Sequence, residues 1–139
     1  MALHADPVRV LSLCSGIGGL DSGLARALPL ARTVCYIERD PFCAGVLRAR
    51  MRTGDLDDAP VWDDIATFDA RAWRGAVDLV VAGIPCQPYS RAGRRRGADD
   101  PRDLWPAVRR VLRDVGPGWV LLENVAGFAT GPRPYLARV

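Results

Sequence analysis

Four short apolar runs recur along the chain and predict strands that are buried on both faces. They span residues 8–13, 33–37, 77–81 and 119–122, and they are rich in Val, Leu and Ile. Mainly apolar runs of this length, without a regular alternation of apolar and polar residues, are typical of strands in a covered parallel sheet. Most are bounded by Gly, Pro or Asp, which favour turns.

Three helices are predicted between these runs. One follows the first run directly, and one begins at Asp40-Pro41, an N-cap followed by proline at the first helical position. Gly54 can end this second helix. The third begins at Asp103 or Trp105, with a proline tolerated in its first turn. Their apolar stripes are, in order, Leu20, Leu24, Ala27 and Leu28; Phe42, Cys43, Val46, Leu47 and Met51; Trp105, Val108, Val111, Leu112 and Val115.

The alternation of strands and helices predicts an α/β fold. We expect a doubly wound, mainly parallel sheet with helices on both faces, formed by residues 1–139 as one domain. Ligands of such sheets bind at the carboxyl ends of the strands. Ligand-binding and catalytic residues are therefore expected at that edge.

The scarce polar residues lie at these strand ends. The chain has 139 residues, 49% hydrophobic and 25% charged, which is typical of a globular protein and not of a disordered one. Its basic residues are all arginine, and it holds only two Glu, one Gln and one Asn. Glu38, Gln87 and the pair Glu123-Asn124 each follow a predicted strand. Their convergence on one edge indicates a functional site there.

Charge and cysteine content narrow the class of protein. The net charge of +3 permits a nucleic-acid partner, and residues 86–113 hold eight arginines against three aspartates. Arg91, Arg94, Arg95 and Arg96 suit phosphate contact, although a solvated loop is the alternative. The four cysteines show no C-x-x-C spacing, so we expect reduced thiols in a cytoplasmic protein and no metal site. No apolar run is long enough to span a membrane.

The glycine-rich turn at residues 14–19 predicts a nucleotide-like ligand. Such a turn can present backbone N–H groups to an anionic group, and Glu38 lies 22 residues after Gly16, where an acid bonds ribose hydroxyls in nucleotide-binding folds. Asp21 stands where the dinucleotide fingerprint has its third glycine. This favours a ligand with an adenosine moiety and a carboxylate, such as S-adenosylmethionine. A purely structural tight turn is the alternative.

Cys86 and Glu123 are the candidate catalytic residues. Cys86 follows a predicted strand between Pro85 and Pro88, in a rigid loop near arginines that favour a thiolate, although a lone cysteine is more often a packing residue. Glu123 is expected to point into the same cleft, with its pKa raised by burial so that it donates a proton. A solvated charge is the alternative for Glu123.

These residues resemble the N-terminal catalytic half of the DNA (cytosine-5) methyltransferase family. The segment 83–90, Gly-Ile-Pro-Cys-Gln-Pro-Tyr-Ser, is similar to the nucleophile loop of that family, and residues 123–125, Glu-Asn-Val, are similar to its proton-donor motif. Residues 14–19 resemble the first cofactor motif, with Cys14 where Phe is usual. Asp64-Ile65 resembles the pair that reads adenine, and residues 100–105 resemble the segment after the nucleophile loop.

The resemblance implies an S-adenosylmethionine-dependent, Rossmann-like fold and a role for each matched residue. Cys86 and Glu123 would be catalytic. Substrate contacts would come from Gln87, Ser90, Asn124 and Val125. Cofactor contacts would come from Cys14, Ser15, Gly16, Ile17, Gly18, Gly19, Glu38, Asp64, Ile65, Pro85 and Leu104.

The implied reaction is methyl transfer from S-adenosylmethionine to C5 of cytosine in DNA, through a covalent adduct of Cys86 with C6. The resemblance also suggests a place in a restriction-modification system. Later family motifs, including the target-recognition region, have no counterpart before Val139, so we expect the N-terminal part of a longer enzyme. The alternatives are a split enzyme completed by a partner chain, a non-catalytic cofactor-binding chain, and a tRNA cytosine-5 methyltransferase.

Overall fold

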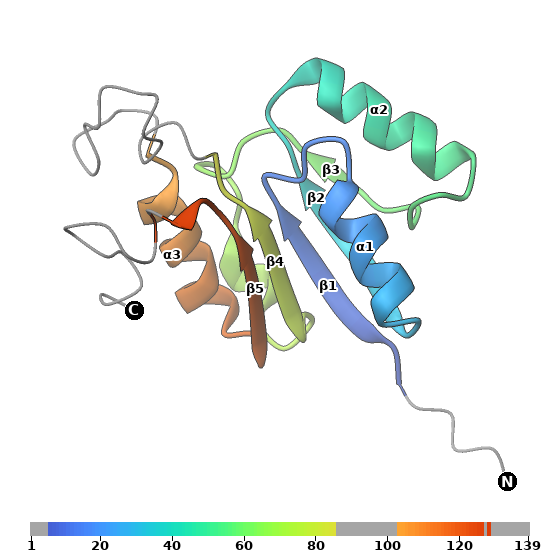
Figure 1. Ribbon diagram of the computed structural model, residues 1–139. Helices are drawn as coiled ribbons and strands as arrows, with labels where there is room; N and C mark the ends of the chain where they lie inside the picture. Colours follow the sequence, from blue (N-terminus) through green and yellow to red (C-terminus); the bar gives the residue numbers. More distant parts are fainter. Residues whose placement is uncertain (1–5, 86–102, 127, 129–139) are drawn as a thin grey trace, which may run out of the picture.

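A parallel sheet forms the centre of the computed structural model, which describes residues 6–85, 103–126 and 128. Its strands lie in the order β3-β2-β1-β4-β5, and every neighbouring pair is parallel (Figure 1). The strands are β1 (Val8–Leu13), β2 (Ala31–Ile37), β3 (Val61–Trp62), β4 (Leu79–Gly83) and β5 (Trp119–Glu123).

Helices cover both faces of this sheet, as the sequence predicts. Helices α1 (Gly19–Ala27) and α2 (Pro41–Arg52) lie on one face, and α3 (Trp105–Val115) lies on the other with the short 3-10 helix η1 (Ala70–Trp73) (Figure 1). None of the described helices is long and apolar enough to cross a membrane. The doubly wound α/β architecture is confirmed.

The predicted N-cap of α2, Asp40, is confirmed, and local contacts also form both ends of α3. The Asp40 carboxylate accepts hydrogen bonds from the backbone N–H groups of Phe42 (2.8 Å) and Cys43 (3.0 Å), which satisfies two donors at the start of α2. The Asp103 carboxylate accepts from Trp105 N (2.9 Å) at the start of α3. Gly116 ends α3 in the left-handed conformation, at φ 63°.

The core has two layers, one on each face of the sheet. Alternate residues of β1 point to opposite faces, so that Leu11 and Leu13 pack against α3 and η1 while Val10 packs against α1. Tyr36 of β2 is fully buried against Leu47 of α2. The α3 layer is the larger of the two.

Three expectations are corrected by the structure. Strand β3 was not predicted, because its two residues lie in an acidic stretch without strand periodicity. Strand β5 is not covered on both faces: Trp119 is 76% exposed, and Val120 and Leu121 are also exposed. Phe42 is 76% exposed and does not belong to the buried stripe of α2, because it lies at the free N-terminal end of the helix.

The strand order creates one switch point. The chain runs outward from β1 to β3 and then crosses to β4 on the other side of β1. The loops that leave β1 and β4 therefore diverge from neighbouring strands at the same edge, the place where doubly wound sheets bind ligands. The glycine turn follows β1, and Pro85 follows β4.

Candidate active site

The glycine turn leaves β1 in a sharply bent backbone. Cys14, Gly16 and Gly18 all have positive φ angles of 52°, 56° and 80°. Ser15 anchors the turn to the sheet, because its N–H donates to the carbonyl of Ile37 (3.1 Å) and its hydroxyl donates to the carbonyl of Ser12 (3.2 Å). The turn is thereby fixed against the end of β2.

Glu38 joins the turn to the start of α2. Its carboxylate accepts one hydrogen bond from Gly16 N (2.7 Å) through Oε2 and another from Asp40 N (2.7 Å) through Oε1. Both bonds are charge-assisted and short. A carboxylate offers about four acceptor positions, so Glu38 keeps capacity for two ribose hydroxyls after these bonds are made.

Arg50 of α2 holds the other side of the turn. Its guanidinium donates to the carbonyl of Ile17 (2.7 Å) and to the hydroxyl of Ser22 (2.7 Å), and the Ser22 hydroxyl donates to the carbonyl of Gly18 (3.0 Å). Arg50 was not among the predicted site residues. No sequence signal separates it from the neighbouring arginines of α2, because its role depends on a contact 33 residues away.

The glycines of the turn have two different functions. A Cβ at Gly18 would lie 2.6 Å from Cδ1 of Leu56 and 3.1 Å from Cδ2 of Leu47, so Gly18 permits close packing under the turn. A Cβ at Gly16 or Gly19 would meet no atom within 4 Å. The backbone at these two positions is therefore open to a ligand.

Asp21 stands beneath the turn and replaces the third glycine of the dinucleotide fingerprint. It is 4% exposed, and its carboxylate accepts hydrogen bonds from the hydroxyls of Ser12 (3.0 Å) and Thr33 (3.4 Å). Burial raises the pKa of Asp21, against the lowering effect of these bonds and of Arg50. The side chain ties α1 to β1 and β2, so its position in the sequence reflects a structural role.

Asp64 and Ile65 form a tight turn after β3. The Asp64 carboxylate accepts from Ala66 N (2.8 Å), its carbonyl accepts from Thr67 N (3.1 Å), and the Ile65 side chain is buried. Glu38 N donates to the carbonyl of Trp62 (2.9 Å), which brings this turn beside the ribose-binding candidate. The residues predicted for ribose and adenine therefore leave adjacent strands.

The loops after β4 and β5 form the second part of the candidate site. The Asn124 side chain donates from Nδ2 to the carbonyl of Ile84 (3.1 Å), and its Oδ1 accepts from Val125 N (2.8 Å). Oε2 of Glu123 lies 3.7 Å from the position of a Cβ on Gly83. Glu123 is thus next to the end of β4, but it is exposed, contrary to the burial that we expected.

Part of the predicted site lies outside the described residues. Cys86, Gln87 and Ser90 are in this group, as is the arginine-rich segment at residues 91–96. Pro85 is described and exposed directly after the buried Ile84. Leu104 caps α3 and packs partly buried against the α3 layer of the core.

The three described cysteines are poor nucleophiles. Burial raises the pKa of Cys14 to about 11, with a further contribution from Glu38. Burial likewise raises the pKa of Cys35 to about 11. The pKa of Cys43 is raised by desolvation and by the carboxylates of Glu38 and Asp40. No group of three metal-binding side chains occurs among residues 6–85, 103–126 and 128.

The described residues fit S-adenosylmethionine. The open backbone at Gly16 and Gly19 leaves room for close approach, and the N-terminus of α1 favours a carboxylate. Glu38 keeps acceptor capacity for the ribose. Ile17 (51% exposed) and Trp62 (44% exposed) supply apolar surface at the same edge.

Comparison with known proteins identifies similar sequences. A family model described as C-5 cytosine-specific DNA methylase matches residues 8–135. The type II methyltransferase M.NgoMIV of Neisseria gonorrhoeae is 36% identical over 121 residues, covering 84% of this chain and 35% of that protein. M.AquIA of Picosynechococcus is 37% identical over 128 residues, covering 86% of this chain and 49% of that protein. The chain thus spans about a third to a half of these relatives.

Solved structures share the fold. The Dnmt2 methyltransferase of S. pombe is 29% identical with a TM-score of 0.67, over 96% of this chain and 39% of that one. DNMT2 of Spodoptera frugiperda has the same TM-score at 22% identity, over 89% of this chain and 37% of that one.

Proposed function

Since the chain belongs to the C-5 cytosine-specific DNA methylase family, whose cofactor is S-adenosylmethionine, we propose that it binds this cofactor and methylates C5 of cytosine in DNA. The observation that carries the proposal is the arrangement of Glu38, which holds the glycine turn and the start of α2 with 2.7 Å bonds while keeping acceptor capacity. S-adenosylmethionine, when bound, supplies the methyl group.

Cys86 is the proposed nucleophile. As a thiolate it adds to C6 of cytosine and forms the Sγ–C6 bond, which makes C5 electron-rich. C5 would then take the methyl group from the sulfonium of S-adenosylmethionine, which would be left as S-adenosylhomocysteine. Loss of the C5 proton then restores the double bond and releases Cys86. The raised pKa of Cys14, Cys35 and Cys43 supports this assignment, because these thiols are held in the unreactive form.

Glu123 is proposed to engage N3 of the cytosine during the addition. Its place beside Gly83 supports this role, because the carboxylate then lies at the base of the loop that leads to Cys86. Asn124 supports the same arrangement, since its bond to the Ile84 carbonyl links the end of β5 to that loop. The target base must leave the DNA stack to reach these groups.

The partner and context of the chain are also proposals. We infer a cytoplasmic restriction-modification methyltransferase in which residues 1–139 form the cofactor-binding and nucleophile part. A polypeptide that carries the remaining family motifs, downstream or as a separate chain, would complete it. The exposed apolar residues of β5 support such a partner, because an exposed apolar sheet edge is unfavourable in water.

The experiment that tests the proposal has two arms. Calorimetric titration of the 139-residue chain with S-adenosylhomocysteine should give saturable one-to-one binding. The completed enzyme, incubated with S-adenosylmethionine and DNA that contains 5-fluorocytosine, should form a covalent adduct that Cys86→Ser abolishes. An adduct that survives Cys86→Ser would refute the nucleophile assignment. Binding without any adduct would favour a non-catalytic chain, and methyl transfer to tRNA in place of DNA would favour the RNA alternative.

A further inference from the structure

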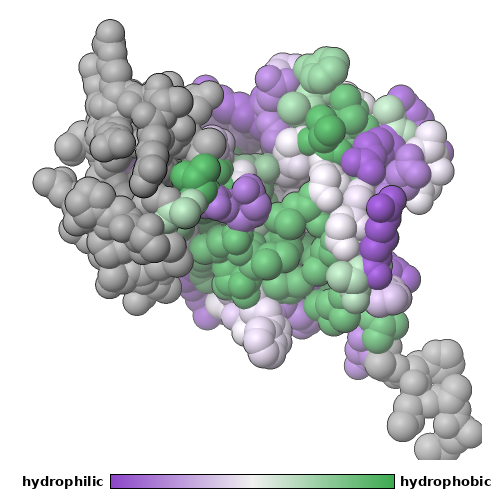
Figure 2. All heavy atoms as spheres, in the orientation of Figure 1, coloured by the Kyte–Doolittle hydropathy of each residue, from purple (hydrophilic) through white to green (hydrophobic). Residues whose placement is uncertain are grey.

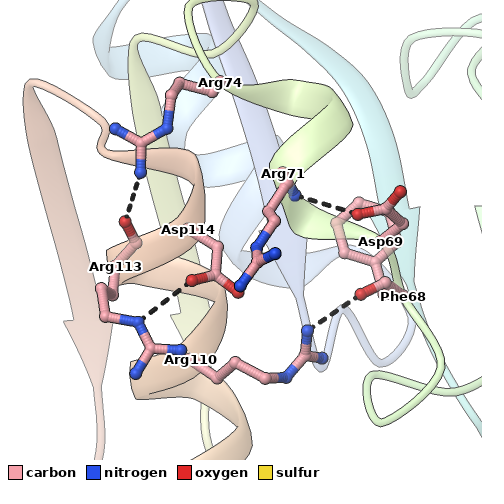
Figure 3. Close-up of polar contacts among 7 residues, drawn as sticks. All are labelled: Phe68, Asp69, Arg71, Arg74, Arg110, Arg113 and Asp114. Carbon is pink, nitrogen blue, oxygen red and sulfur yellow. Dashed lines mark hydrogen bonds and ion pairs between the residues drawn. The ribbon is translucent and has the colours of Figure 1, made fainter.

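Arg110 of α3 reaches from the helix to the backbone of the Asp64–Ile65 turn. Its Nη2 donates to the carbonyl of Ile65 (2.5 Å), and its Nη1 donates to the carbonyl of Phe68 (3.1 Å). Figure 3 shows the side chain extended from α3 toward Phe68. The two contacts join residues that are 45 and 42 positions apart in the sequence. The Arg110 guanidinium thus binds the backbone at both ends of the segment 65–68.

The other charged groups around Arg110 are paired in a different way. Arg113 forms an ion pair with Asp114 (3.0 Å), and Arg74 donates to the carbonyl of Arg113 (2.9 Å) (Figure 3). The first contact lies within α3 and the second joins the end of η1 to α3, so neither includes the turn after β3. Among these three arginines of the described residues, Arg110 donates hydrogen bonds to that turn, and its planar guanidinium suits two carbonyls better than a point charge would.

The Asp64–Ile65 turn needs these two hydrogen bonds because β3, the strand before it, is short. β3 consists of two residues, which pair with Tyr36 and Ile37 of β2. The buried side chains of Ile65 and Phe68 attach the turn to the core, but apolar contacts are not directional. Hydrogen bonds to the two carbonyls fix the orientation of the backbone, and with it the position of Asp64.

We propose that Arg110 is a positioning residue for cofactor recognition, holding the Asp64–Ile65 turn in the conformation that distinguishes adenine from other bases. The inference rests on the proposed function, in which the chain binds S-adenosylmethionine, and on the family resemblance, which implies that Asp64 and Ile65 read its adenine. Arg110 acts through the turn and makes no contact with the cofactor itself. Loss of the Arg110 side chain should therefore lower the preference for adenine over other bases without unfolding the protein.

The test compares two ligands that differ only in the base. S-adenosylhomocysteine and S-inosylhomocysteine are titrated into the full chain and into the Arg110→Gln, Arg110→Lys and Arg109→Gln variants. Arg109 is the matched control, because it is the neighbouring residue of α3 and is exposed. Two charge-assisted bonds are lost in Arg110→Gln, so we expect its preference for the adenine ligand to fall about tenfold.

Each outcome has a definite meaning. Arg110→Lys should retain part of the preference, and Arg109→Gln should retain all of it. The proposal is overturned if Arg110→Gln weakens both ligands by the same factor, because a merely structural role predicts that result. If Arg110→Gln fails to fold, Arg110→Lys decides, and an unchanged preference in that folded variant overturns the proposal. Failure of the unsubstituted chain to bind either ligand would instead refute the proposed function.

Discussion

The loops after β1 and β2 and the loops after β4 and β5 carry the two halves of the candidate site, and they are held differently. In the first half, Glu38 and Arg50 each make two bonds of 2.7 Å that fix the glycine turn. In the second half, Asn124 makes a single described bond to the loop after β4, and Glu123 is exposed. The described residues therefore hold the proposed cofactor half more firmly than the proposed catalytic half.

The strands β2 and β5 of the two halves differ in the same direction. Tyr36 of β2 is fully buried, whereas Trp119 of β5 is 76% exposed. By register, Trp119 pairs with Leu79 and Leu121 pairs with Val81, so both extend the sheet face that α1 covers elsewhere. Figure 2 shows hydrophobic surface over this part of the molecule. From this difference we expect the proposed catalysis to need more residues than the proposed cofactor binding.

The largest effect should come from removing the carboxylate of Glu38, and removal of the Glu123 carboxylate is the comparison. Glu38→Ala removes two charge-assisted acceptors, so we expect affinity for S-adenosylhomocysteine to fall by about a hundredfold or more. Glu123→Ala should change this affinity by less than about threefold, because Glu123 belongs to the catalytic half. Calorimetric titration measures both. Equal losses in the two variants would contradict the division of the site into two halves.

The next effect concerns the packing under the glycine turn. Gly18→Ala combines a positive φ of 80° with a Cβ 2.6 Å from Leu56, so we expect the free energy of unfolding to fall by about 2–4 kcal/mol. Gly16→Ala has strain without contact and should cost about 1–2 kcal/mol. Urea denaturation of both variants measures the difference. Equal costs would mean that packing under the turn contributes little.

The features that could be predicted from the sequence are those that depend on residues close together in the chain or on a general property of the fold. Asp40 caps α2, and Asp103 accepts from the first backbone N–H of α3, because each needs only a backbone N–H two or three residues ahead. The convergence of Glu38 with the glycine turn was also predictable, since parallel strands bring their carboxyl ends to one edge. Both features rest on local chemistry and on a general property of the fold.

The remaining features depend on contacts between distant residues. No sequence pattern distinguishes Arg110, which binds two carbonyls, from Arg109, which is exposed, because the difference lies in the direction each takes from the same helix. Strand β3 exists because β2 offers it an edge. The exposure of β5 was missed because an apolar run does not reveal what covers it.

A smaller effect on stability is expected between the two halves, where Arg9 of β1 pairs with Asp78, the residue before β4. Asp78 accepts from Arg9 N, Nε and Nη2 at 2.8–2.9 Å, and these bonds lower the pKa of Asp78 to about 2. A folded pKa below the ordinary 3.8 stabilises the protein above about pH 4, and this contribution is lost as the pH falls toward 2.

Asp78→Asn should therefore flatten the fall in stability between pH 4 and pH 2. The change should be smaller than that of Gly18→Ala, because the ion pair is partly exposed and is screened by solvent. Thermal unfolding across this pH range measures it, with Asp63→Asn, an exposed carboxylate, as the control. An unchanged slope in Asp78→Asn would show that the pair of Arg9 and Asp78 contributes no acid sensitivity.

The smallest effect on stability should come from the uncovered edge itself. Trp119→Ser and Leu121→Ser remove exposed apolar groups, so we expect the free energy of unfolding of the isolated chain to change by less than about 0.5 kcal/mol. Val81→Ala, at the buried register partner of Leu121, should cost about 2 kcal/mol or more. Trp119→Ser and Leu121→Ser should also lower the binding of a hydrophobic dye to the chain. A large loss of stability in Trp119→Ser would mean that β5 is covered in solution by residues of this same chain, and the contrast between the two halves would then fail.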